Sequence, residues 1–521
     1  MESPGRGTRA PLPGWRPRVP AGLASAAMKA RLCFLLLSSL ALLLVPAVPA
    51  SADSPSTGGD LTVAQTLGDR DLTLVLRRVT SVPGPLRVDV LTHAGSAAGT
   101  LSVGLGADPP GTVRLGPAPG TYGVTLHVGQ PGPAELTVSD GVRTARVPFV
   151  VSKTVTSPPE HAVYGGFLAA GVLLLVTLAV AVRARRLAWA LLPGAGVVAG
   201  LAVAITGAVL SASLPLPPQP GLQVDATIEN ATDPYASSRP LTADWSRPPA
   251  ILTVGGAGLV AGHPADVALG LTDAATGLPV DDLVVHDSAL LHLLVVGPAG
   301  RLWHVHPIRT APGVFSVYLT LPQAGHYAVA AELERRGGGV QLVRSATGLD
   351  VTAGAAPAPA APAPLEVGTA DKATTTVSGV PVSIAAIGTT TASATTLTAT
   401  VGDTATLQPW LGMLGHLIVV GPLSAGDDAQ SAPVWAHAHS MGDLTPGAGM
   451  AGMGGGAMPE MAGLMPVNGD SAADETVAAY GPSLSFTFTF PLPGRYRIWI
   501  QAERDYRVLT IPAVLDVRAA R

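Results

Sequence analysis

Two long uncharged apolar stretches interrupt an otherwise mixed pattern of apolar and polar positions. The first, residues 162–182, reads AVYGGFLAAGVLLLVTLAVAV, and the second runs from about residue 187 to 214. At a rise of about 1.5 Å per residue, each can cross the roughly 30 Å hydrocarbon core of a membrane as a helix. Three arginines at 183–186 separate the stretches, and the positive-inside rule places such a loop in the cytoplasm. The pattern predicts a two-helix transmembrane hairpin with both flanking parts extracytoplasmic; two buried helices of a soluble domain are the alternative.

Outside these stretches the apolar positions alternate over short segments that Pro and Gly separate. Before the hairpin they include Asp71–Arg78, Leu86–Thr92 and Ala134–Val138. Alternation with a period of two indicates half-buried strands, and closely spaced turns favour a β-sandwich. The 61 Gly and 49 Pro residues fit strands joined by tight turns. We therefore expect a mainly β fold of three extracytoplasmic Ig-like β-sandwich modules, with the transmembrane hairpin between the first and second.

The N-terminal residues have the layout of a secretory signal peptide. Lys29 and Arg31 precede the apolar run 32–44, and Ala50-Ser51-Ala52 supplies a small-residue cleavage site. The true start is expected at Met28. The single cysteine, Cys33, lies in the apolar run, so the mature chain would contain none. Disulfides are then excluded, and a metal ion would be held by His, Met or carboxylates.

Composition shifts along the chain mark the expected boundaries. The predicted segments are a signal peptide (1–52), an N-terminal β-sandwich (53–157), the two transmembrane helices with their Arg loop (158–214), a Pro-rich linker (215–250), a first β-sandwich repeat (251–352), an Ala/Pro linker (353–365) and a second repeat (366–521) with a Met/Gly-rich loop (441–475).

The last two modules share motifs in the same order. HLLVVGP at 292–298 matches HLIVVGP at 416–422, and WHVH at 303–306 matches WAHAH at 435–439. Further along, Gly-x-Tyr and Leu-Asp-Val motifs also recur in both modules. Four matches in one order indicate a duplicated domain.

The duplicated motifs carry histidines. Positions i and i+2 of a strand project from the same face. His304 and His306 can therefore point at one ion, and so can His437 and His439. His292 and His416 each begin an apolar strand, which we expect to lie beside the His-x-His strand and to supply a third imidazole.

The second repeat adds methionines. Met441 continues the row of His437 and His439, and Met413 precedes His416 by three residues. The Gly-rich loop holds Met450, Met453, Met458, Met461 and Met465. Thioethers prefer Cu(I), whereas imidazole accepts Cu(I), Cu(II) or Zn, so together they favour copper as Cu(I) or Cu(II). The first repeat has no accompanying Met and is expected to be a weaker copy. Alternatively, the histidines are structural and the methionines fill gaps.

The motif H-L-[LI]-V-V-G-P, followed by W-(x)-H-x-H and a Pro-x-x-Gly-x-Tyr hairpin, resembles domains of bacterial exported proteins linked to heavy-metal and copper handling. These are the YtkA-like and FixH-like types, similar in outline to CopC copper carriers. The run His437–Met441 also looks like the His/Met ligand sets of PCuAC-type copper chaperones, although their full Met/His spacing is missing. The resemblance covers 250–350 and 395–517 and implies Ig-like β-sandwiches that bind copper.

These features predict an integral protein of the cell membrane, with two spans, that binds extracytoplasmic copper for capture, buffering or delivery. A copper-handling envelope protein is its candidate partner. The alternative is a non-enzymatic envelope scaffold or adhesion protein with structural histidines. An enzyme is not expected, because the chain has neither a G-x-S-x-G nor an H-E-x-x-H motif. The net charge of −4 and the lack of a basic patch argue against nucleic acid.

Overall fold

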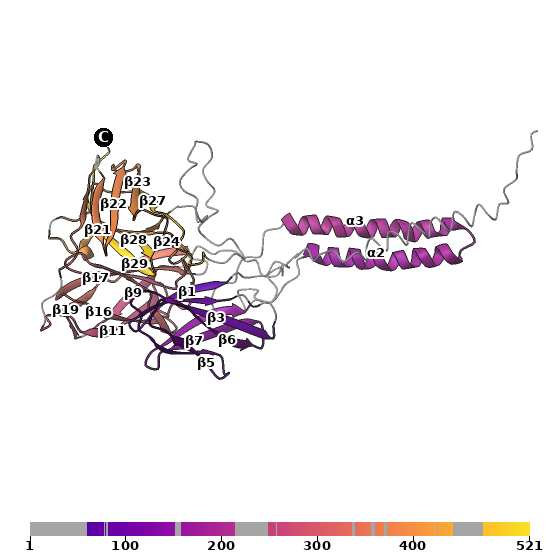
Figure 1. The fold of residues 1–521 in the computed structure, drawn as a ribbon, viewed down its shortest axis with the longest axis horizontal. Helices are drawn as coiled ribbons and strands as arrows, with labels where there is room; N and C mark the ends of the chain where they lie inside the picture. The colour runs from indigo at the N-terminus through magenta and orange to yellow at the C-terminus, as the bar shows by residue number, and fades with distance from the viewer. Residues whose placement is uncertain are drawn as a thin grey trace, which may run out of the picture. The chain divides into compact units, whose positions relative to one another are not determined.

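The computed structural model of the chain is mainly β, with two helices between the first and second β modules (Figure 1). It describes residues 60–77, 79, 82–151, 158–213, 248–256, 258–335, 339–355, 360–368, 372–424, 426–440 and 473–520. The expected signal peptide and nearly all of the Pro-rich linker lie outside these residues. The helices belong to one compact unit and the strands to another.

The helical unit is a hairpin of α2 (Pro158–Arg183) and α3 (Leu191–Ser213), joined through the 3-10 helix η1 (Leu187–Ala190). Both helices are long and apolar enough to cross a membrane. Small residues let their backbones meet: a Cβ added to Gly166 would lie 2.7 Å from the Gly200 carbonyl oxygen. Close approach through small residues is the usual packing of membrane helices. The side of the membrane that the arginine loop faces stays a prediction.

The N-terminal module is a β-sandwich of two four-stranded sheets. One sheet has the order β1 (Leu61–Leu67), β2 (Arg70–Leu76), β3 (Gly84–Thr92), β6 (Gly120–Val128); the other has the order β5 (Gly111–Leu115), β4 (Gly99–Leu105), β7 (Gly132–Ser139), β8 (Thr144–Val151). Of the three alternating segments named above, the second and third lie within β3 and β7, and β2 contains residues 71–76 of the first, which confirms these as strands. Their inward side chains form the module's core, where Leu74, Val88 and Leu101 are fully buried.

The first repeat follows the helices. Its strands are β9 (Ala250–Gly255), β10 (Leu259–Val260), β11 (Pro264–Asp273), β12 (Leu283–Val284), β13 (His292–Val296), β14 (Leu302–Val305), β15 (Ile308–Ala311), β16 (Val314–Thr320), β17 (Gly325–Arg335), β18 (Gly339–Arg344) and β19 (Leu349–Thr352). One sheet runs β10-β19-β17-β13-β14, with β12 and β18 also on β17, and the other runs β15-β16-β11-β9.

The second repeat has the same plan. It comprises β20 (Leu365–Val367), β21 (Ala373–Val377), β22 (Val380–Ile387), β23 (Ala394–Val401), β24 (Leu407–Gln408), β25 (His416–Gly421), the 3-10 helix η2 (Ala429–Ser431), β26 (Val434–His439), β27 (Ser483–Thr489), β28 (Gly494–Arg504) and β29 (Arg507–Val517). Its larger sheet, β20-β29-β28-β25-β26 with β24 on β28, has the same order as the larger sheet of the first repeat, except that the one strand β29 pairs with β28 where β18 and β19 pair with β17. The smaller sheet runs β21-β22-β23-β27. β9 and β20 each begin one residue before the predicted start of their modules.

Local details repeat as well. Tyr327 and Tyr496 are fully buried, and each hydroxyl donates a hydrogen bond to the carbonyl oxygen four residues earlier. Gly325 and Gly494 have φ angles of 130° and 136°, and an added Cβ would meet the proline that ends the matching HLLVVGP or HLIVVGP motif. A glycine is required where both the φ angle and the proline exclude a side chain.

The two larger sheets pack against each other. β13 and β25 are buried at every residue, as expected for strands that are covered on both faces. One shared apolar cluster joins Leu294, Val296 and Ala330 of the first repeat to Ile418 and Trp499 of the second. The Trp499 indole also donates a hydrogen bond of 3.1 Å to the Gly300 carbonyl. This interface between the repeats positions the histidines.

Candidate metal centre

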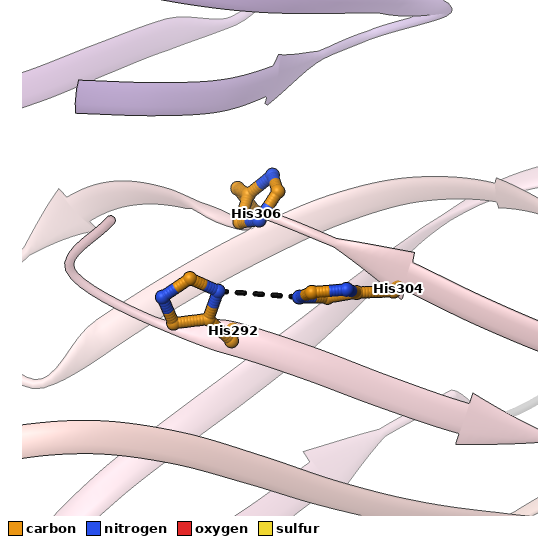
Figure 2. A group of neighbouring side chains, drawn as sticks. All are labelled: His292, His304 and His306. Atoms are coloured by element: carbon orange, nitrogen blue, oxygen red, sulfur yellow. Dashed lines mark hydrogen bonds between the residues drawn. The ribbon is translucent and has the colours of Figure 1, made fainter. Parts of the chain in front are cut away.

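Each repeat brings three histidines together on two neighbouring strands. β13 pairs antiparallel with β14 in a register that sets His292 beside His306, and β25 pairs with β26 so that His416 lies opposite His439. The prediction that His292 and His416 lie on strands next to the His-x-His strands is therefore confirmed. Within each triplet the ligand nitrogens lie within 4.8 Å of one another. Figure 2 shows the first triplet, with its rings facing a common space.

The two triplets meet at the interface between the repeats. The ring centroid of His437 lies 4.9 Å from that of His304 and 5.4 Å from that of His292. His304 also lies 5.6 Å from His416. We call these residues the six-histidine cluster: His292, His304, His306, His416, His437 and His439. The sequence predicted two separate metal sites, with weaker binding in the first repeat. In the structure the two triplets are halves of one cluster.

In the first triplet, outer partners fix which ring nitrogen carries the proton. His292 Nε2 donates to the His286 carbonyl oxygen at 3.0 Å, and His304 Nδ1 donates to Gln501 Oε1 at 2.8 Å. Since a neutral imidazole carries one proton, His292 Nδ1 and His304 Nε2 are left with lone pairs. These two nitrogens face each other at 3.2 Å (Figure 2).

The second triplet repeats this arrangement. His416 Nε2 donates to the Trp410 carbonyl oxygen at 3.1 Å, and His437 Nδ1 donates to Glu332 Oε1 at 3.1 Å. The inner nitrogens, His416 Nδ1 and His437 Nε2, lie 3.1 Å apart. In both triplets the first histidine of the His-x-His motif, His304 or His437, donates to a residue of the other repeat.

The inner nitrogens are spaced like ligands of one ion. Two nitrogens bound tetrahedrally at 2.0–2.1 Å lie about 3.3 Å apart. Without a cation, two lone pairs at 3.1–3.2 Å face each other with no hydrogen between them. In addition, Nε2 of His306 and Nε2 of His439 are buried without a hydrogen-bond partner. Buried polar atoms are rarely left in this state, and a shared cation would satisfy them.

Burial keeps five of the six cluster histidines uncharged. Desolvation is the largest cause that moves the pKa of His304, His306, His416 and His437 well below its usual value. It also lowers the pKa of His292. A metal ion binds only the deprotonated imidazole, so these histidines are in the binding form at neutral pH.

The structure adds residues that the sequence analysis missed. His286, Asp287 and Glu332 form a third group with metal-ligand spacing. Asp287 Oδ2 lies 2.9 Å from His286 Nε2 and 3.2 Å from His439 Nε2. Burial raises the pKa of Asp287, but the hydrogen bond from His286 and the charge on His439 lower it to about 2. Aligning the repeats further upstream would have drawn attention to His286, because His286 and Trp410 occupy equivalent positions, six residues before His292 and His416.

Trp410 borders the first triplet. Its ring lies edge-on to His304 at 5.2 Å and to His306 at 5.9 Å. Beside them is a cavity of 140 Å³, whose wall includes His304, His306, Trp410 and, from the N-terminal module, His93. The same module binds the backbone just after β14, because the Thr66 amide donates to the His306 carbonyl at 2.7 Å.

Of the predicted methionine ligands, only Met413 lies within the residues that the structure describes. Met413 is buried in the turn before β25, where its backbone pairs with Trp410. β26 ends at His439, before Met441. Met441 and the loop methionines Met450, Met453, Met458, Met461 and Met465 lie outside the described residues.

Comparisons with known proteins assign no function to the chain. A model described as a domain of unknown function (DUF8832) matches residues 374–519, which is the second repeat. No curated protein sequence matches the chain.

Solved structures of Ig-like and fibronectin-like domains are similar to parts of it. The Lin-41 filamin domain is 17% identical, with 20% of this chain and 97% of that chain covered and a TM-score of 0.15. Invasin, a bacterial integrin-binding protein, is 11% identical over 88% of this chain and 60% of its own, with a TM-score of 0.13. The fibronectin(III)-like modules of Clostridium thermocellum CbhA are 11% identical over 52% and 96%, with a TM-score of 0.13. The resemblance to copper-handling proteins is not tested by these matches.

Proposed function

We propose that this chain is a membrane-anchored, extracytoplasmic copper-binding protein that captures, buffers or delivers copper through the six-histidine cluster. The observation that carries the proposal is the pair of inward-facing nitrogens in each triplet, at 3.2 and 3.1 Å. Their protons are held on the outer nitrogens, so only lone pairs face the centre. Ligands ordered in advance by outer hydrogen bonds are typical of metal sites.

Several features favour copper over other metals. Imidazole suits copper and zinc, whereas Mg²⁺ and Ca²⁺ require oxygen ligands. Neutral imidazoles carry no charge to balance a buried ion, and burying an ion costs more as its uncompensated charge grows. That cost favours Cu(I) over a dication in the neutral part of the cluster. The methionines that follow His439 in the sequence supply thioethers, which select Cu(I).

A second candidate function is a scaffold in which the histidines only join the repeats. The hydrogen bonds of His304 to Gln501 and of His437 to Glu332 cross the interface and could hold it without a metal. In that case, removing histidines should lower the stability of the metal-free protein. The metal-binding function instead predicts that the stability gained on adding copper is lost.

The test compares the full chain, purified in detergent and stripped of metal, with the double variant His306→Ala/His439→Ala. Neither His306 Nε2 nor His439 Nε2 makes a hydrogen bond, and the polar contact that is lost is that of His439 Nε2 with Asp287 Oδ2 at 3.2 Å, so the fold should persist. Titration with Cu(I) against a coloured chelator under nitrogen should show at least about a hundredfold weaker binding in the variant. Changing the residues that orient a ligand already costs about 10–100-fold, and removing ligands should cost no less.

The matched control is His127→Ala/His326→Ala, which removes two histidines outside the cluster and should leave the Cu(I) affinity unchanged. Equal affinities of the wild type and the His306→Ala/His439→Ala variant would contradict the proposal. If the metal-free variant then also melts at a lower temperature than the control, the scaffold function is favoured.

A further inference from the structure

The two triplets have the same ligands but different surroundings. β13 pairs with β17 so that Glu332 lies opposite His292, and β25 pairs with β28 so that Gln501 lies opposite His416. Glu332 and Gln501 are therefore equivalent positions of the duplicated domain. Each accepts a hydrogen bond from the His-x-His histidine of the other repeat. The duplication thus gives the second triplet a carboxylate where the first has an amide.

At a second pair of equivalent positions, the residue beside the second triplet is again acidic and its counterpart is uncharged. Asp287 and Leu411 each lie five residues before the first triplet histidine, in turns of the same kind, with φ angles of 47° and 57°. These turns are closed by matching bridges, His286 to Ala289 and Trp410 to Met413. Asp287 is 3.2 Å from His439 of the second triplet. The equivalent position in the other repeat is apolar.

The charges on the two sides are therefore unequal. Glu332 and Asp287 contact His437 and His439 of the second triplet directly, whereas in the first triplet Glu332 is only the strand neighbour of His292. His286 offsets one negative charge when it is protonated. At the first triplet the equivalent contact is neutral, because His304 donates to the Gln501 amide oxygen. His93 in the wall of the neighbouring cavity is paired with Glu503. A surplus negative charge stabilises a dication more than a monocation. At about 5 Å and an effective dielectric constant of about 20, the difference is on the order of a few hundredfold in affinity.

We propose that the cluster binds two metal ions at unequal sites: a monovalent ion, Cu(I), at His292, His304 and His306, and a divalent first-row ion at His416, His437 and His439. This inference rests on the proposed function, since it requires the histidines to bind metal. It goes further by assigning a charge preference to each triplet.

The test uses the full chain in detergent with two probes, Cu(I) and Co(II), the latter visible through its tetrahedral absorption bands. Wild-type protein should bind two Cu(I). It should bind one Co(II) at least about tenfold more tightly than a second. His439→Ala should abolish the tight Co(II) bands, whereas His306→Ala should retain them.

Two nearly isosteric exchanges test the cause without removing a ligand. Glu332→Gln should weaken tight Co(II) binding by about tenfold or more while changing Cu(I) affinity by less. Gln501→Glu should strengthen Co(II) binding at the first triplet. Each variant gives one repeat the residue that the other already carries, so the fold is expected to tolerate both.

The outcomes separate the two proposals. Two equal Co(II) affinities, a tight site lost in His306→Ala and kept in His439→Ala, or equal effects of Glu332→Gln on both metals would overturn the charge preference alone. If the wild type binds neither Cu(I) nor Co(II) better than the His306→Ala/His439→Ala variant, the proposed function fails as well.

Discussion

His93 carries a positive charge in a buried position, and that charge ties the N-terminal module to the second repeat. Its Nδ1 donates to Glu503 Oε1 at 2.6 Å, and its Nε2 lies 3.0 Å from the Thr73 hydroxyl. Burial alone would lower its pKa. The hydrogen bond and charge of Glu503, with the charges of Glu475 and Asp71, outweigh burial and raise the pKa to about 9.

The raised pKa predicts a pH dependence of stability. Because His93 binds its proton more tightly in the folded state, its contribution is complete below the unfolded pKa of 6.5 and is lost as the pH rises to about 9. The shift corresponds to about 3 kcal/mol. Burial also raises the pKa of the neighbouring Glu475, to about 7, so its own cost is already complete above that pH. We expect the metal-free protein to lose unfolding free energy between pH 7 and 9.

Thermal unfolding followed by tryptophan fluorescence measures this loss. In Glu503→Gln the charge that holds the proton is gone, so the decline between pH 7 and 9 should be smaller. Glu366→Gln, which removes an exposed partner of Arg495, is the control and should behave like the wild type. The same decline in Glu503→Gln as in the wild type would show that His93 is not its source.

The sequence predicts which histidines share a strand face, because the geometry of a single strand determines this. The His-x-His spacing gives two imidazoles on one face, and the apolar strand that starts with His292 or His416 supplies the third. The outer partners were not predictable, because Glu332 and Gln501 are ordinary polar residues until the repeats meet. Met413, which its proximity in sequence to His416 suggested as a ligand, is buried in the turn before β25, and its role as a ligand stays a prediction.

At the scale of elements, the two apolar strands that begin with His292 and His416 differ from the alternating strands, and this difference indicates burial on both faces. HLLVV and HLIVVG have no polar alternation, and both strands are buried throughout. Such a run is typical of a strand covered on two faces. It therefore indicated a partner surface beyond the module's own core. It could not indicate which surface, since apolar packing is non-directional and any of the modules offers an apolar sheet.

The helical hairpin gives a prediction at this scale. Gly166→Leu places a side chain where a Cβ already lies 2.7 Å from backbone atoms of α3, so the helices must move apart. We expect a loss of about 1–3 kcal/mol, the usual cost of overpacking. Unfolding of the hairpin in mixed micelles, followed by helical circular dichroism, measures it.

Gly171→Leu in the same helix is the matched control, because nothing lies within 4 Å of the Cβ it would gain. It changes helix propensity by the same amount without touching α3. If both variants unfold alike, the packing of the hairpin does not depend on Gly166.

At the scale of the whole molecule, Trp499 links the interface between the repeats to the metal centre. It is 2% exposed and packs within the apolar cluster that both repeats share. Trp499→Ala should lower the unfolding free energy by about 3–5 kcal/mol. It should also weaken Cu(I) binding, because the two triplets lose their alignment. The measurements are thermal unfolding and the Cu(I) titration on the same sample.

Leu136→Ala controls for general destabilisation. Leu136 is fully buried in the N-terminal module, away from the cluster, so its replacement should lower stability and leave Cu(I) affinity unchanged. If folded Trp499→Ala binds Cu(I) as the wild type does, the packing between the repeats is not needed for binding.

The exchange of hydrogen bonds between the repeats has a consequence for cooperativity. Each triplet takes the partner that orients its His-x-His histidine from the opposite repeat, Gln501 or Glu332. An ion that binds more tightly to the oriented triplet therefore also stabilises the contact between the two repeats. Through mass action, an ion present at about a thousand times its dissociation constant adds about 4 kcal/mol to that association. Metal supply would thus set whether the duplicated halves unfold as one unit or separately.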